Sequence, residues 1–93
     1  MLTQGQKVRA IRYIRQWQQV DLAELAGIDA STLHAFEADK RATRKTRRKI
    51  EAALGYGLSD PPVEAAFSIL TNDYASADLV TLALALLVQA NGR

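Results

Sequence analysis

LAELAGIDASTLHAFE, residues 22–37, is the stretch that decides the fold of this chain of 93 residues. It contains parts of two short amphipathic patterns, which predict helices over residues 19–26 and about 30–38. Gly27 separates them, and glycine ends a helix cheaply because it adopts the left-handed backbone conformation without steric penalty. Asp29 is placed to cap the following helix by accepting backbone N–H groups of its first turn. The stretch therefore predicts two short helices joined by a tight turn.

Further helices are predicted on both sides of this stretch. Apolar residues at every third position predict an amphipathic helix over roughly residues 3–16. Thr43 or Thr46 is suited to cap a fourth helix, which ends where Gly55 follows it. Residues 55–62, rich in glycine and proline, form the best domain boundary in the chain.

Two helices are predicted after this boundary. Asp60 is placed to cap the fifth, because Pro61 suits the first helical position, and Ser76 is placed to cap a sixth that reaches about residue 90.

Residues 79–88, LVTLALALLV, are apolar at nine of ten positions, and a helix that is apolar on every side must be buried on every side. A membrane span needs about 20 apolar residues, so we expect a second copy of the chain to cover this helix. The expected dimer contacts are Phe67, Leu70, Leu79, Leu82 and Leu86. The alternative is that both faces of the helix pack inside one protomer.

Charge is distributed unevenly along the chain. Residues 1–54 carry eleven Lys/Arg against six Asp/Glu, whereas residues 55–93 carry one against four. Seven of the twelve basic residues fall within residues 40–49. This asymmetry favours a polyanionic partner for the first half, although a solvated helix face is an alternative explanation of the basic run.

The composition also excludes several classes of protein. The absence of cysteine excludes disulfides and thiolate metal sites. A single histidine, no glycine-rich phosphate loop and no clustered carboxylates leave nothing from which to assemble a catalytic or metal site. We therefore expect no enzyme, no cofactor and no metal. Polar residues follow Met1 where a secretory signal has its apolar segment, so we expect a cytoplasmic protein.

The helix predicted over residues 30–38 has two different sides. Leu33 and Phe36 lie on one side, whereas Ser31 and His34 lie on the other, because an α-helix turns about 100° per residue. One side packs and the other is presented to solvent. Two short helices joined in this way form a helix-turn-helix, whose second helix lies in the major groove of DNA.

Residues 17–41, WQQVDLAELAGIDASTLHAFEADKR, resemble the helix-turn-helix of the Cro/C1-type repressors, a large group with many phage and plasmid regulators. The matching positions are Gln19, Asp21, Leu22, Ala23, Ala26, Gly27, Ile28, Leu33, Glu37, Lys40 and Arg41. The resemblance extends from about Val8 to Gly55. It implies an all-α, lambda-repressor-like bundle of four to five helices, to which this chain adds a C-terminal apolar dimerisation helix. We expect a helix-turn-helix DNA-binding domain over residues 1–56 and a helical dimerisation segment over residues 57–93.

The family implies a sequence-specific transcriptional regulator, most often a repressor, that binds a pseudo-palindromic operator as a homodimer. Helical phase and family register together predict the base-facing residues Ala30, Ser31, His34 and Ala35. The expected phosphate contacts are Gln19, Lys40, Arg41, Arg44 and Lys45. The family also implies that Arg12 pairs with Glu37. His34 and Gln19 have a plainer interpretation as solvated surface residues.

The chain departs from the family pattern after Glu37, where Ala38 and Asp39 replace the common glycine-containing turn. Aspartate tolerates the left-handed conformation better than most residues, but here it also brings negative charge near the expected phosphate path. Two other functions stay open. One is an antitoxin whose C-terminal helices cover a toxin, and the other is an adaptor that uses the fold for protein contacts without binding DNA.

Overall fold

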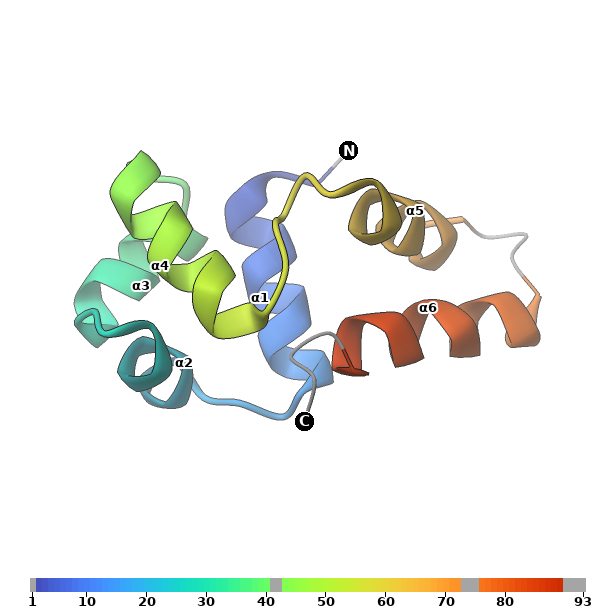
Figure 1. Cartoon of the computed structure of the whole chain (residues 1–93), viewed down its shortest axis with the longest axis horizontal. Coiled ribbons are helices and arrows are strands. Elements are labelled where there is room, and N and C mark those ends of the chain that lie inside the picture. Colours follow the sequence, from blue (N-terminus) through green and yellow to red (C-terminus); the bar gives the residue numbers. More distant parts are fainter. Residues whose placement is uncertain (1, 41–42, 73–75, 90–93) are drawn as a thin grey trace.

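The computed structural model describes residues 2–40, 43–72 and 76–89, and within them it contains six helices and no strand. The helices are α1 (Gln4–Ile14), α2 (Gln19–Ala26), α3 (Ala30–Glu37), α4 (Arg44–Leu54), α5 (Pro61–Leu70) and α6 (Ala77–Gln89). Figure 1 shows α1 in the middle of the molecule, with α2, α3 and α4 to one side of it and α5 and α6 to the other. The predicted all-α class is confirmed.

Helix α1 is shorter at both ends than the predicted range of 3–16. Thr3 stands before it as the N-cap, where its hydroxyl accepts a hydrogen bond from the Gln6 N–H and the Gln6 side chain accepts one from the Thr3 N–H. This reciprocal pair is a capping box. At the other end Gln16 has a φ of 60°, which the periodicity of apolar residues could not reveal, and it takes the chain out of the helix.

The predicted helix caps have different outcomes. Thr43, rather than Thr46, caps α4 with its hydroxyl, and Ser76 caps α6 in the same way, as predicted. Asp29 is the N-cap residue of α3, as predicted, but its side chain makes no capping hydrogen bond to this helix. Asp60 precedes α5, but its carboxylate accepts from the N–H of Gly57 behind it instead of from the helix. In both cases the residue type identified the helix start but not the hydrogen bonds of the side chain.

The turn between α2 and α3 has the expected geometry. Gly27 has a φ of 69°, and its N–H donates to the Glu24 carbonyl at 3.2 Å. The N–H of Ile28 then donates to the Ala23 carbonyl at 3.0 Å, so the last carbonyls of α2 are satisfied. The left-handed glycine redirects the chain within a few residues, which allows α3 to start at a new angle.

A single hydrophobic cluster connects all six helices. Its buried members are Val8, Ile11, Leu22, Ala23, Ala26, Leu33, Phe36, Ile50, Leu54, Leu58, Val63, Ala66, Phe67, Ala83 and Leu87. Phe67, expected at a dimer interface, is only 5% exposed, so its side chain packs inside the protomer. Leu70 is half-buried against the same cluster. The reason is that α5 uses its whole apolar stripe to pack against the rest of the chain.

Helix α6 is held against the rest of the protomer by polar contacts as well as by this cluster. The carbonyl of Leu87 accepts hydrogen bonds from Arg15 Nε and from the Tyr56 hydroxyl, both at 3.1 Å. Arg15 also donates through Nη2 to the Leu54 carbonyl at 2.8 Å. One guanidinium at the end of α1 therefore binds the last turns of both α4 and α6, where helices carry unpaired carbonyls.

Only part of α6 is covered by its own chain. Ala83 and Leu87 are buried, whereas five large apolar side chains remain exposed, namely Leu79, Leu82, Leu84, Leu86 and Val88. Packing of both faces inside one protomer, the alternative to dimerisation, is therefore not what the structure shows. No helix in the described part of the chain is long and apolar enough to cross a membrane.

Candidate nucleic-acid interface

Helix α3 buries one side and exposes the other. Leu33 and Phe36 are fully buried, whereas Ser31 and His34 are exposed. Of the other two residues predicted to face bases, Ala30 and Ala35 are half-buried. The apolar contacts fix the orientation of α3, so its polar residues are presented on the outer surface.

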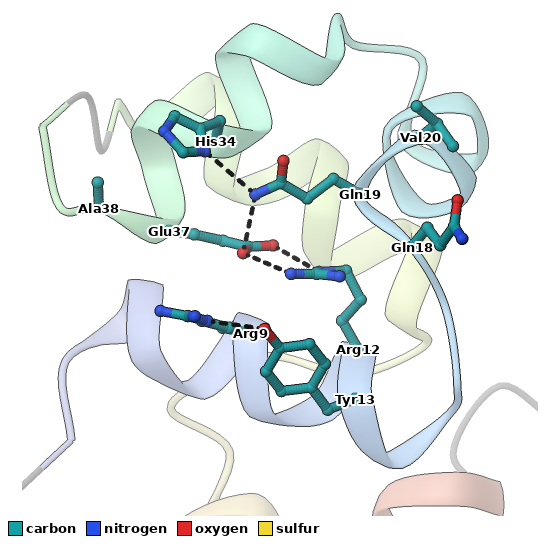
Figure 2. A pocket seen from close by; sticks show the side chains of 9 residues that line it. All are labelled: Arg9, Arg12, Tyr13, Gln18, Gln19, Val20, His34, Glu37 and Ala38. Atoms are coloured by element: carbon teal, nitrogen blue, oxygen red, sulfur yellow. Dashed lines mark hydrogen bonds and ion pairs between the residues drawn. The ribbon is translucent and has the colours of Figure 1, made fainter.

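Arg12 of α1 and Glu37 of α3 form a buried ion pair (Figure 2). Arg12 Nε lies 2.9 Å from Glu37 Oε2, and Arg12 Nη2 lies 3.1 Å from Oε1, so the contact is bidentate. The Arg12 and Glu37 side chains are 8% and 4% exposed. The hydrogen bond to Glu37 raises the pKa of Arg12 above its ordinary value, against the opposing effect of burial. The pair fastens the last turn of α3 to α1.

Gln19, the first residue of α2, connects this pair to the outer surface of α3 (Figure 2). Its Nε2 donates to Glu37 Oε1 at 3.2 Å and lies 3.4 Å from Nδ1 of His34. Four side chains from three helices are thus joined in the order Arg12, Glu37, Gln19, His34. The structure therefore brings together four of the residues that sequence reasoning had placed in three separate roles.

A pocket of about 530 Å³ opens beside this network. Its walls are formed by Arg9, Arg12, Tyr13, Gln18, Gln19, Val20, His34, Glu37 and Ala38 (Figure 2). Arg9 Nε donates to the Tyr13 hydroxyl at 3.3 Å, and the guanidinium groups of Arg9 and Arg12 lie over the Tyr13 ring at 5.6 and 4.8 Å from its centroid. The hydrogen bond from Arg9 lowers the pKa of Tyr13.

Arg9 and Tyr13 were missed by sequence reasoning. The available signal was their spacing of four residues, which places two side chains on the same face of a helix. A cationic and aromatic pair is thus added to the edge of the pocket. No described group of three or more histidine, aspartate or glutamate side chains could hold a metal ion.

The cations predicted to contact phosphate follow α3 in the chain. Lys40, Arg44 and Lys45 are exposed, whereas Arg41 lies outside the described residues. Later in α4, Arg48 and Lys49 are also exposed, but Arg47 is half-buried, with Nε 3.8 Å from Glu51. The exposed cations lie on one side of α4, because residues at i, i+1, i+4 and i+5 fall within a sector of about 140°.

Asp39 occupies the left-handed conformation that its position requires, with a φ of 60°. Its carboxylate accepts a hydrogen bond from the Thr3 hydroxyl at 2.8 Å and one from the Gly5 N–H at 3.3 Å. The negative charge thus lies at the N-terminus of α1, where the helix dipole favours it. The substitution of aspartate into this turn adds a link between the end of α3 and the start of α1.

In a comparison with protein-family models, residues 9–60 match the family described as Helix-turn-helix. The matched range runs from the middle of α1 to the residue before α5 and covers more than half of the chain. Comparisons with curated proteins and with solved structures gave no match.

Proposed function

Since this chain belongs to the Cro/C1-type helix-turn-helix family of DNA-binding regulators, we propose that it is a sequence-specific transcriptional repressor that binds a pseudo-palindromic operator as a homodimer. The observation that supports this most directly is the orientation of α3. Its apolar side is sealed in the core, while Ser31 and His34 are exposed on the opposite side. A helix presented in this way can enter the major groove.

The contacts proposed with DNA divide into two kinds. Ser31 and His34 supply polar groups for base edges, and Ala30 and Ala35 supply methyl groups that can contact thymine. Gln19, Lys40, Arg41, Arg44 and Lys45 are proposed to contact phosphates, which fixes the register of the protein on the duplex without encoding sequence. Because these four residues of α3 can make only weak contacts with bases, part of the specificity is proposed to come from recognition of DNA shape.

The homodimer is proposed to form through α6. Leu79, Leu82 and Leu86 are spaced at i, i+3 and i+7, so they form one exposed apolar stripe on this helix. The stripe carries no charge, and a second copy related by a two-fold axis would present the same stripe to it. Residues 57–93 would then act as the dimerisation segment of a DNA-binding domain formed by residues 1–56. The two copies of α3 would lie about 34 Å apart, in successive major grooves.

A second candidate function is that of an antitoxin, and it uses the same helix. Leu84 and Val88 are exposed on another side of α6 from the Leu79 stripe, which leaves apolar surface for a protein other than a second copy. The two functions differ in what the purified protein does. A soluble dimer supports the repressor, whereas a protein that stays in solution only when a toxin is co-expressed supports the antitoxin.

The experiment that tests DNA recognition is selection of bound fragments from a pool of random duplexes. We expect the recovered fragments to share an inverted repeat. The double variant Ser31→Glu/His34→Glu should lose binding without losing its helical circular dichroism spectrum. Ser59→Glu/Ser68→Glu is the matched control, because it adds the same charge at two exposed serines of the other half and should bind as the unmodified protein does. Failure to enrich any fragment at low salt contradicts the proposed function.

A further inference from the structure

We propose that Gln19 sets the tautomer of His34, so that α3 presents this imidazole to DNA as a hydrogen-bond donor through Nε2–H. The part of this inference that concerns DNA rests on the proposed function. The tautomer itself is a property of the protein without DNA, so the two parts can be tested separately.

The argument starts at Arg12, whose guanidinium stays protonated in proteins. Its bidentate contact with Glu37, at 2.9 and 3.1 Å, uses both oxygen atoms of that carboxylate as acceptors. An ionised carboxylate can only accept hydrogen bonds. Any group that hydrogen-bonds to the oxygen atoms of Glu37 must therefore be a donor.

Gln19 is the next member of the network. One end of its side-chain amide lies 3.2 Å from Glu37 Oε1, and this end must be the NH₂ group because a carbonyl oxygen there would face another acceptor. The two hydrogens of Nε2 can serve two acceptors at once. The carboxylate therefore decides the orientation of the amide.

The same Nε2 atom lies 3.4 Å from Nδ1 of His34. Because an amide nitrogen donates and does not accept, Nδ1 must be the unprotonated ring nitrogen of this contact. A neutral imidazole with a bare Nδ1 carries its proton on Nε2. The charge of Arg12 thus determines, through Glu37 and Gln19, which nitrogen of His34 holds the proton.

The consequence for recognition is that His34 offers a donor to its surroundings. Figure 2 shows the second ring nitrogen on the side of the ring away from Gln19, and the residue is exposed. In the major groove a donor selects N7 or O6 of guanine, N7 of adenine or O4 of thymine, and it rejects the amino group of cytosine. Gln19 is the positioning residue and His34 is the residue that contacts the base. Because both side-chain hydrogens of Gln19 are used within the protein, the phosphate contact proposed for Gln19 would be made by its backbone N–H at the start of α2.

The tautomer can be measured directly, because the chain contains a single histidine. Protein labelled with ¹⁵N in histidine, without DNA and at mildly alkaline pH, should give long-range ¹H–¹⁵N correlations in which Nε2 is protonated and Nδ1 is not. Gln19→Glu places an acceptor opposite Nδ1, so we expect its spectrum to change to a protonated Nδ1. Gln18→Glu is the matched control, because it adds the same charge at the neighbouring residue, which lines the same pocket and makes no hydrogen bond to His34.

A protonated Nδ1 in the neutral imidazole of the unmodified protein would overturn the inference, and so would equal spectral changes in Gln18→Glu and Gln19→Glu. If Gln19→Glu does not fold, Gln19→Met serves instead, because it removes the donor and keeps the length of the side chain. In that variant the population of the Nε2–H tautomer should fall towards that of a free histidine. An unchanged population in a folded Gln19→Met variant contradicts the role of Gln19.

The DNA part uses a duplex recovered by the selection described above. In each half-site one position should prefer an acceptor-bearing base, and His34→Ala should reduce that preference by about threefold to tenfold, the value of one hydrogen bond. If the preferred base is adenine, whose only major-groove acceptor is N7, its 7-deaza analogue should weaken binding of the unmodified protein and leave that of His34→Ala unchanged. Equal loss in both proteins overturns base reading by His34. Absence of any DNA binding, together with the expected tautomer, would instead remove the proposed function and leave the assignment of the tautomer standing.

Discussion

Lys7 of α1 and Glu64 of α5 form an ion pair between the two halves of the chain, with Lys7 Nζ 2.8 Å from Glu64 Oε1. The Lys7 side chain is 9% exposed, whereas that of Glu64 is 47% exposed. Lys7 Nζ also donates to the Leu58 carbonyl at 3.5 Å. The ammonium of Lys7 is thus buried where α5 meets α1, and its counter-ion is the partly exposed carboxylate of Glu64.

This arrangement predicts that the two partners respond differently to mutation. Glu64→Gln leaves the buried ammonium without its counter-ion and should lower the free energy of unfolding by about 1 to 2 kcal/mol. Breaking a fully buried ion pair costs more than this, but the exposure of Glu64 reduces the loss. Lys7→Met removes the charge but keeps the apolar part of the side chain, so it should cost less. Urea unfolding measures both, with Glu24→Gln as a control at an exposed glutamate. Equal stability of Glu64→Gln and the control would contradict the role of the pair.

The turn at Gly27 shows what could be predicted from the sequence. Its evidence is local, because a glycine and a few apolar residues on each side suffice to define two helices and the turn between them. Helix α2 accordingly has the predicted bounds, and α3 ends within one residue of its predicted end. The resemblance to the Cro/C1-type family then added the pairing of Arg12 with Glu37, which lie 25 residues apart.

The contacts of Lys7, Arg15 and Asp39 could not be predicted in this way. Each was a polar residue within or beside a predicted helix, and the hydrogen-bond partners of its side chain lie 34 or more residues away in the sequence. No periodicity encodes which distant carbonyl or carboxylate a side chain will meet. The same limit applies to Phe67. An apolar stripe shows that a helix face is buried, but it does not show whether that face packs against its own chain or against a second one.

Gly5 should tolerate no side chain. A Cβ atom at this position would lie 2.5 Å from the Phe36 carbonyl oxygen and 2.7 Å from that of Glu37, so α3 would have to move away from α1. We expect Gly5→Ala to lower the free energy of unfolding by about 1 to 3 kcal/mol through overpacking, and to weaken DNA binding because α3 shifts. Gln4→Ala, one residue earlier in the same helix, is the control. A Gly5→Ala protein as stable as this control would show that α1 and α3 separate without cost.

The exposed cations near the start of α4 should determine the salt dependence of DNA binding. Each phosphate contact adds about 0.9 to the slope of log K against log salt. In a dimer, Lys45→Gln removes two such contacts, so we expect the slope to fall by about 1.8, with affinity lost equally for all sequences. Titrations of one duplex at several salt concentrations measure it. An unchanged slope would place Lys45 away from the phosphates.

The ionisation of two tyrosines should separate on alkaline titration. The hydrogen bond from Arg9 lowers the pKa of Tyr13, whereas burial raises that of Tyr56 against the opposing charge of Arg15. Tyrosinate absorbance should therefore lose its early component in Tyr13→Phe and its late component in Tyr56→Phe. Components removed in the reverse order would contradict both assignments.

The same shifts predict how stability depends on pH. Tyr56 has a folded-state pKa above its unfolded value of about 10, so its contribution is complete below that pH and is lost as the pH rises through the folded-state pKa. The loss in alkali should therefore be smaller in Tyr56→Phe. Tyr13, whose folded-state pKa is lowered, acts in the opposite sense, and Tyr13→Phe should lose stability in alkali more steeply than the unmodified protein. Urea unfolding at a series of alkaline pH values gives both slopes.

The dimer proposed to form through α6 predicts a contrast between two adjacent residues. Leu82 is 64% exposed and lies in the apolar stripe, so Leu82→Asp places a charge in the proposed interface without opening a cavity in the protomer. Thr81, also exposed, points about 100° away around the helix, and Thr81→Asp is the matched control. Analytical ultracentrifugation should show monomers for Leu82→Asp and dimers for Thr81→Asp. DNA affinity should fall steeply only in the first variant, because a monomer contacts one half-site at a time. A Leu82→Asp protein that remains dimeric would move the interface away from α6.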